Sequence, residues 1–199
     1  SVGLYTVAMT LSQLNWLVAQ AAATVLLPLV ASRVGAGDDS ALHVAAATRT
    51  VVGITCALAL ATAAAAGPVV PWVFGAEFEG SVLPLYLLLP GIVAFVPSIV
   101  LASYFGGHGL PRINLKGSLA GLVTILVLSV ALIPRLGTAG AAIATSGACL
   151  VSSIVLLFSF SRSTRISPWA VVVPRRGDVA AVNRALIQRV GVGLRGNGR

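Results

Sequence analysis

The chain has 199 residues, of which 57% are hydrophobic and 9% are charged, and its mean hydropathy is +0.99. An ordinary globular domain has about a quarter of its residues charged, so this composition excludes a water-soluble domain. We therefore expect an integral membrane protein of the all-α class. The net charge is +8, so the positions of the basic residues bear on the orientation and the partners of the chain.

Five apolar segments reach the length of about 20 residues that a helix needs to cross the roughly 30 Å hydrocarbon layer of a membrane. They cover residues 5–32, 45–67, 81–104, 115–134 and 138–161. We predict a polytopic bundle of about five spanning helices over residues 1–162, followed by a basic tail over 163–199. The chain opens on Ser-Val-Gly-Leu-Tyr with no basic segment before its first apolar run, so that run is not a signal peptide. We expect the chain to be part of a longer protein.

The first span carries polar residues in one stripe, because Thr6, Gln13, Gln20 and Thr24 are spaced by seven, seven and four residues. Asn15 lies nearby. Polar side chains are tolerated in a membrane when they line a cavity or bond to a neighbouring helix, at about 0.6–2 kcal/mol for each interhelical bond. For Gln13, Asn15 and Gln20 both interpretations stay open.

Proline and glycine interrupt the third span at four positions, which are Pro84, Pro90, Gly91 and Pro97. An interior proline removes a backbone hydrogen bond, and lipid cannot satisfy the freed carbonyl, which must therefore face protein or a wet cavity. We interpret Pro90, Gly91 and Pro97 as a hinge, since broken helices recur in transporters. The alternative is a static kink in a membrane scaffold.

The fourth and fifth spans carry small residues at intervals of four, namely Gly117 and Gly121, and then Gly140, Ala144, Ala148 and Ser152. Such spacing predicts close helix packing. Cys56 and Cys149 fall inside apolar runs, so we expect two buried thiols without a disulfide.

Basic residues gather in the first loop, the third loop and the tail: Arg33, Arg49, Arg112, Lys116, Arg162, Arg165, Arg175, Arg176, Arg184, Arg189, Arg195 and Arg199. Arg135 lies in a loop of the opposite set, while Glu77 and Glu79 occupy the other loop on that side. The positive-inside rule then predicts that the chain enters from outside and that its C-terminus is cytoplasmic.

The basic tail begins directly after the last span, so anionic membrane lipids are the expected partner and nucleic acid is not. Trp169 suits the headgroup zone. Asp178 could cap a short amphipathic helix that lies on the membrane, with Val179, Val182, Leu186 and Val190 on one face. A disordered basic tail is the alternative.

Several chemical patterns are missing from the sequence. No Asp, Glu, Lys or Arg sits near the centre of a span, so the sequence provides no intramembrane carboxylate for ion coupling. We also find no metal-ligand cluster, no pair of nucleophile and base, and no redox motif. We therefore expect no enzymatic activity and no cofactor.

A resemblance covers residues 2–162 through several short motifs. V-G-L-Y-T-V-A at 2–8, V-V-P-W-V-F-G-A-E-F-E-G-S-V-L-P-L at 69–85, L-L-P-G-I at 88–92 and Y-F-G-G-H-G-L-P-R at 104–112 occur in order, as does I-P-R-L-G-T-A-G-A-A-I-A-T at 133–145. In order and spacing they resemble the C-terminal lobe of the polysaccharide biosynthesis, or O-antigen, flippases, which belong to the same superfamily as the MATE exporters.

The resemblance implies a two-lobed transporter of the bacterial cytoplasmic membrane. It would move an undecaprenyl-diphosphate-linked oligosaccharide between leaflets by alternating access, and this chain would be a partial MATE-like lobe that requires an N-terminal lobe. Basic residues in the family are thought to attract the diphosphate.

On physical grounds we name Arg49 as the first headgroup-binding candidate, because it could extend its guanidinium to the membrane surface. Arg33, Arg112 and Lys116 are further candidates, and topological anchoring is the alternative role for all four. The competing functions are a MATE-type exporter of organic cations and a non-transporting scaffold.

Overall fold

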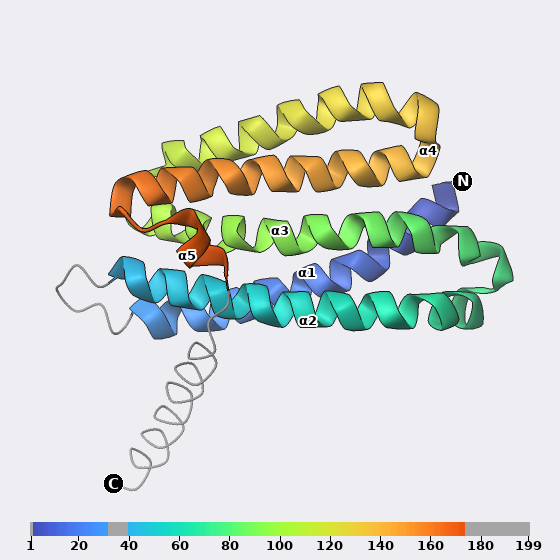
Figure 1. Cartoon of the computed structure of the whole chain (residues 1–199), viewed down its shortest axis with the longest axis horizontal. Helices are drawn as coiled ribbons and strands as arrows, with labels where there is room; N and C mark the ends of the chain where they lie inside the picture. Colours follow the sequence, from blue (N-terminus) through green and yellow to red (C-terminus); the bar gives the residue numbers. More distant parts are fainter. Residues whose placement is uncertain (1, 32–39, 174–199) are drawn as a thin grey trace, which may run out of the picture.

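The computed structural model describes residues 2–31 and 40–173 (Figure 1). Nearly all of these residues are helical, and the described part of the chain contains no strand. The prediction of an all-α bundle is therefore confirmed. Three stretches of this part are long and apolar enough to cross a membrane, namely Val44–Phe74, Ala76–Gly107 and Pro111–Thr164.

The helices follow one another as long, roughly antiparallel rods, which Figure 1 shows side by side. In chain order they are α1 (Val2–Ala31), α2 (Ser40–Phe74), the short 3-10 helix η1 (Ala76–Ser81), α3 (Val82–Gly107), α4 (Pro111–Thr164) and α5 (Pro168–Val172). The helix α2 continues through Pro68 and Pro71, beyond the span expected to end at residue 67.

The helix α4 is a hairpin of two arms. A straight helix of 54 residues would be about 80 Å long. Gly137 breaks it with a φ of 55° and a ψ of −126°, a backbone geometry that a residue with a Cβ rarely adopts. Residues 111–136 form the first arm and residues 138–164 form the second arm, which turns back alongside it (Figure 1). The two predicted spans 115–134 and 138–161 thus occupy one arm each.

Small residues let the two arms of α4 approach closely, as the four-residue spacing predicted. Gly117 and Gly121 are both buried. A Cβ added to Gly121 would lie 3.4 Å from the Ala148 carbonyl oxygen, and one added to Gly117 would collide with Leu156. Close packing at these positions is confirmed.

The largest apolar cluster lies where α3 ends and α5 packs onto the bundle. Phe105 and Phe160 are fully buried there, with ring centroids 6.5 Å apart in an edge-to-face arrangement. Leu101 of α3 and Val171 of α5 are also fully buried in this cluster. The cluster therefore fastens α5 to α3 and to the second arm of α4.

The link from α4 to α5 follows from local residue types. Arg165 ends α4 in the left-handed conformation, with a φ of 59°, and its N–H donates to the Ser161 carbonyl. Ser167 is extended, as a residue before proline prefers, and Pro168 opens α5 at a position that needs no N–H donor. The amphipathic helix expected around 178–190 lies outside the described residues, as does Arg33.

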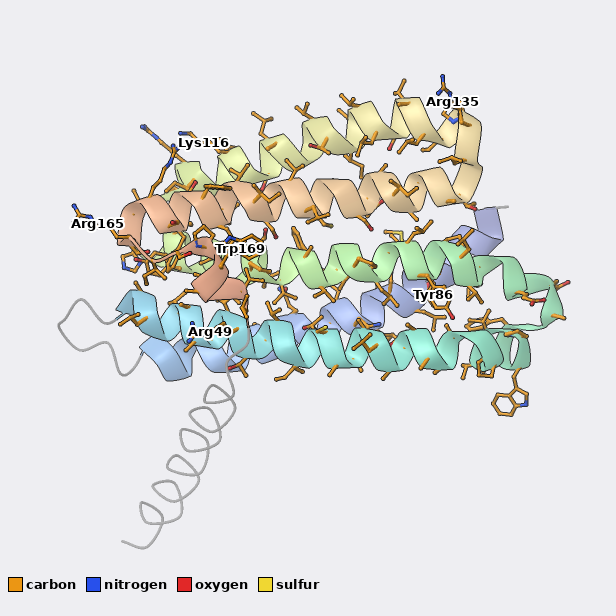
Figure 2. All side chains as sticks on the ribbon, in the orientation of Figure 1. Arg49, Tyr86, Lys116, Arg135, Arg165 and Trp169 are labelled. Carbon is orange, nitrogen blue, oxygen red and sulfur yellow. The ribbon has the colours of Figure 1, made fainter. Side chains whose placement is uncertain are left out.

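The described charged residues lie near the two ends of the bundle. Figure 2 shows Lys116 and Arg165 at the end where α5 lies, whereas Arg135 lies at the turn of the α4 hairpin at the other end. Glu77 and Glu79 are exposed on η1. Trp72 and Trp169 are both highly exposed, at 86% and 77%.

Candidate functional site

An open groove of about 910 Å³ runs between α2, α3, the second arm of α4 and α5. Its walls are almost entirely apolar side chains. Those of α2 include Val52, Ala59 and Ala63, those of α3 include Leu89, Pro90, Val93 and Pro97, and those of α4 include Leu150, Ile154, Leu157 and Phe158. A groove of this kind suits a hydrocarbon chain, because it offers apolar contact and few hydrogen-bonding groups.

Each end of the groove carries an aromatic residue with a polar group. At one end the Tyr86 hydroxyl donates to the Ala63 carbonyl oxygen over 3.1 Å. At the other end α5 lies across the groove and contributes Pro168, Trp169 and Val172 to its lining. Tyrosine and tryptophan are common where an apolar region meets a polar one.

Arg49 lies at the α5 end of the groove (Figure 2). The positions of Val52 and Cys56, three and seven residues later, continue its face of α2 into the groove. Arg49 is half-buried, and its Nη1 donates a hydrogen bond to the Ala170 carbonyl oxygen of α5. The first headgroup candidate from the sequence therefore bonds to α5, the short helix at this end of the groove.

The carbonyls beside the prolines of α3 face the second arm of α4. The Ser146 hydroxyl donates to the Leu87 carbonyl oxygen over 2.5 Å, and the Ser153 hydroxyl donates to the Ala94 carbonyl oxygen. Leu87 and Ala94 each precede a proline by three residues, at Pro90 and Pro97. Neighbouring helices often satisfy carbonyls in this way in membranes.

Two further contacts bring α3 close to the second arm of α4. The Ser98 and Ser153 hydroxyl oxygens lie 2.8 Å apart and share a hydrogen bond. A Cβ added to Gly91 would lie 2.5 Å from both the Cα and the Oγ of Ser146. We call the contact made by Leu87, Gly91, Ala94, Ser98, Ser146 and Ser153 the serine seam.

The polar residues of α1 divide between two contacts. Asn15 is only 2% exposed and bonds to α2, because its Nδ2 donates to the Thr62 Oγ1 over 3.2 Å. Gln13 is exposed and lines a pocket of about 230 Å³ beside Trp16 and Ser146. Gln20 is exposed. Within the stripe predicted from spacing, Gln13 thus lines a pocket, while Asn15 beside the stripe joins α1 to α2.

Arg112 and Lys116 do not line the groove. Arg112 and Lys116 are exposed one turn apart near the start of α4. Figure 2 places Lys116 in a different layer from Arg49. The three basic candidates that the structure describes, Arg49, Arg112 and Lys116, therefore do not form one cluster, and among them only Arg49 lies beside the groove.

The two thiols differ in exposure, since Cys56 is exposed and Cys149 is half-buried. Both Cys56 and Cys149 are free, as expected, but Cys56 is exposed in the groove, so the prediction that it is buried was wrong. An apolar run in a membrane helix includes residues that face away from the protein core, and hydrophobicity alone does not separate them.

The sequence analysis missed α5 and the donors of the serine seam. The pair Ser167-Pro168 is a helix-start signal that precedes α5. Ser146 and Ser153 are seven residues apart, as are Pro90 and Pro97, and this equal spacing was visible in the sequence.

No protein-family model, no curated protein and no solved structure matches this chain. Among residues 2–31 and 40–173 there is no group of three or more histidine, cysteine or acidic side chains that could hold a metal ion. The groove, the arginine at its end and the packing around it are therefore the features of the described residues that bear on function.

Proposed function

We propose that this chain is part of a membrane transporter that moves an anionic, lipid-linked oligosaccharide from the inner to the outer leaflet of the bacterial cytoplasmic membrane. The observation that carries the proposal is the apolar groove with Arg49 at one end. A substrate with a long hydrocarbon chain and a diphosphate headgroup needs both an apolar surface and a basic group. The resemblance to the polysaccharide flippases supports the same substrate class.

The proposed topology has five spans, formed by α1, α2, α3 and the two arms of α4. Each arm of about 26 residues would be close to 40 Å long, which exceeds the roughly 30 Å hydrocarbon layer. The end with Lys116 and Arg165 would face the cytoplasm, and the end with Glu77 and Glu79 would face outward. Two highly exposed tryptophans, Trp72 and Trp169, would then lie at the two headgroup levels.

The proposed mechanism places the moving contact between α2 and α3. Pro90 and Pro97 line the groove together with Ala94 and Ser153, so the serine seam forms the edge of the groove where α3 meets the second arm of α4. The hinge at Pro90, Gly91 and Pro97 would therefore bend α3 together with the second arm of α4. A second lobe would complete the substrate cavity.

The experiment that tests the proposal is depletion of the protein in its own cells, followed by analysis of which leaflet holds the undecaprenyl-linked oligosaccharides. Rescue is then attempted with Ala63→Phe, which places a ring in the groove, and with Ala64→Phe as the matched control. Ala63 lines the groove, whereas its neighbour Ala64 is exposed and does not. We expect inner-leaflet accumulation with Ala63→Phe and normal export with Ala64→Phe.

Other outcomes decide against the proposal. Normal lipid-linked sugars together with increased retention of cationic dyes would favour the MATE-type exporter. Equal rescue by both phenylalanine variants would show that the groove takes no part in transport. Normal sugars and normal dye efflux would favour a scaffold.

A further inference from the structure

The helix α5 combines a firm attachment with a position across the groove. Val171 is fully buried in the cluster with Phe105 and Phe160. Trp169, two residues earlier, has different surroundings, because it lines the groove and is 77% exposed. Five residues make few backbone hydrogen bonds, so the attachment of α5 depends on its contacts with the bundle.

We propose that Arg49 and α5 form a latch at the cytoplasmic end of the groove, which opens when the headgroup of an anionic membrane lipid binds. When α5 is docked, the Arg49 guanidinium donates to the Ala170 carbonyl oxygen. A phosphate headgroup of a membrane lipid competes for that guanidinium, and α5 then leaves the end of the groove. The inference rests on the proposed function, because it names how the same groove admits an anionic lipid.

The chemistry of the two partners favours this exchange. Arginine presents its donors in a planar fork, which matches two phosphate oxygens. The phosphate carries a negative charge and the Ala170 carbonyl does not, so the phosphate adds Coulombic attraction to its hydrogen bonds with the guanidinium. Arg49 is half-buried at the groove end, where a lipid headgroup meets less competition from water than on the open surface.

The position of Arg49 links headgroup binding to the groove. Val52 and Cys56 continue the same face of α2 inside the groove. A lipid whose headgroup reaches Arg49 can therefore lay its hydrocarbon chain along the residues that follow. Docked α5 blocks that path, because Pro168, Trp169 and Val172 occupy the end of the groove.

The test measures how often the buried position of α5 becomes accessible. Val171→Cys is introduced into a chain with Cys56→Ser and Cys149→Ser, and the full chain is placed in lipid bilayer discs. The discs contain phosphatidylcholine alone or mixed with phosphatidylglycerol, and a water-soluble maleimide labels the thiol. Labelling of a buried thiol requires local opening, so its rate reports the fraction of undocked α5.

We expect labelling to be about tenfold faster with phosphatidylglycerol than with phosphatidylcholine alone, in line with the strength of a charged hydrogen bond. Arg49→Ala should label fast in both lipids and lose the difference between them. Arg162→Ala is the matched control, because Arg162 is an exposed arginine at the end of α4. It should keep the lipid dependence.

A second measurement leaves Val171 intact. In a chain with only Cys149→Ser, the native Cys56 thiol reports access of the same maleimide to the groove. It should also label faster with phosphatidylglycerol, and this dependence should disappear with Arg49→Ala.

Three results would overturn the latch. These are equal labelling in both lipids, a lipid dependence that survives Arg49→Ala, and a rise caused by inorganic phosphate alone in phosphatidylcholine discs. Neither labelling experiment requires transport. Failure of oligosaccharide export with intact lipid-dependent labelling would therefore reject the proposed function alone, and the reverse result would reject the latch alone.

Discussion

The helix α3 has two different neighbours, and the contrast between them shows which part of the bundle is rigid. Towards the second arm of α4 it forms the serine seam, with hydroxyls on two of its carbonyls and a glycine against Ser146. Towards α2 it forms one wall of the apolar groove. Interhelical hydrogen bonds are directional, while apolar contacts tolerate sliding.

This difference indicates how a bundle can contain both a firm unit and a movable contact. The serine seam makes α3 and the second arm of α4 one unit, because its bonds join the carbonyls of Leu87 and Ala94 to the neighbouring helix. Each of these carbonyls lies next to one that a proline leaves without its helical donor. Between α2 and α3, the Tyr86 hydroxyl bonds to the Ala63 carbonyl at one end of the groove. The following predictions test whether the two contacts differ in strength.

The largest effect is expected from Gly91→Ala in the serine seam. The added Cβ would meet the backbone of Ser146 at 2.5 Å, so one helix must shift and the seam bonds must lengthen. We expect a loss of about 2–3 kcal/mol in the free energy of unfolding, as for an overpacked core. Unfolding by sodium dodecyl sulfate in mixed micelles measures this quantity.

Gly67→Ala in α2 is the matched control, since a Cβ there meets nothing within 4 Å. It should leave the protein unchanged or stabilise it by up to about 1 kcal/mol, because alanine is the better helix former. Equal losses in both variants would contradict the rigid seam.

The next largest effect is expected from Ser153→Ala. This change removes the donor to the Ala94 carbonyl and the bond with Ser98. Interhelical hydrogen bonds in membranes average about 0.6 kcal/mol, so the loss of two should cost about 1 kcal/mol. The same unfolding measurement applies.

Ser159→Ala, on the same arm of α4, is the control. The Ser159 hydroxyl donates to the Val155 carbonyl of its own helix over 2.7 Å, so its removal leaves the contact between helices intact. A cost as large as that of Ser153→Ala would show that the serines act within their helix and not across the seam.

The serine seam also shows which features of the fold can be predicted from the sequence and which cannot. Pro90 and Pro97 predicted freed carbonyls that face either protein or a wet cavity, and hydrophobicity predicted the helices. The freed carbonyls belong to Tyr86 and Val93, four residues before each proline. Ser146 and Ser153 bond the next carbonyls, those of Leu87 and Ala94, from 59 residues away. A rule of local spacing cannot identify a partner at that distance.

The groove was harder to predict for a related reason. Its lining consists of common apolar residues such as Val52, Ala63 and Val93, which have the same chemistry as residues that face lipid. Only the arrangement of three long helices and α5 makes them a site. Arg49 was identifiable because an arginine at the start of an apolar span can extend to the headgroup level, but its Ala170 partner was not.

A smaller effect is expected where α1 joins α2. Asn15 and Thr62 exchange hydrogen bonds of 3.2 and 3.3 Å between buried or half-buried side chains. A double-mutant cycle with Asn15→Ala and Thr62→Ala should give a coupling energy of about 0.6 kcal/mol. The effects of Gln13→Ala and Thr62→Ala on the free energy of unfolding should be additive, since Gln13 lines the pocket beside Trp16 and Ser146 instead. Additive effects of Asn15→Ala and Thr62→Ala would show that this hydrogen bond does not stabilise the contact between α1 and α2.

The smallest effect should come from Tyr86→Phe, and it tests the comparison most directly. This change removes the hydroxyl that joins α3 to the Ala63 carbonyl of α2 at the groove. Because Tyr86 is 42% exposed, we expect a loss below about 0.5 kcal/mol in the free energy of unfolding. Tyr104→Phe is the matched control, since the described hydrogen bonds of Tyr104 involve its backbone carbonyl. A loss above about 1 kcal/mol for Tyr86→Phe alone would mean that α2 and α3 are fastened as firmly as the serine seam, and the groove would then be a fixed surface instead of a movable one.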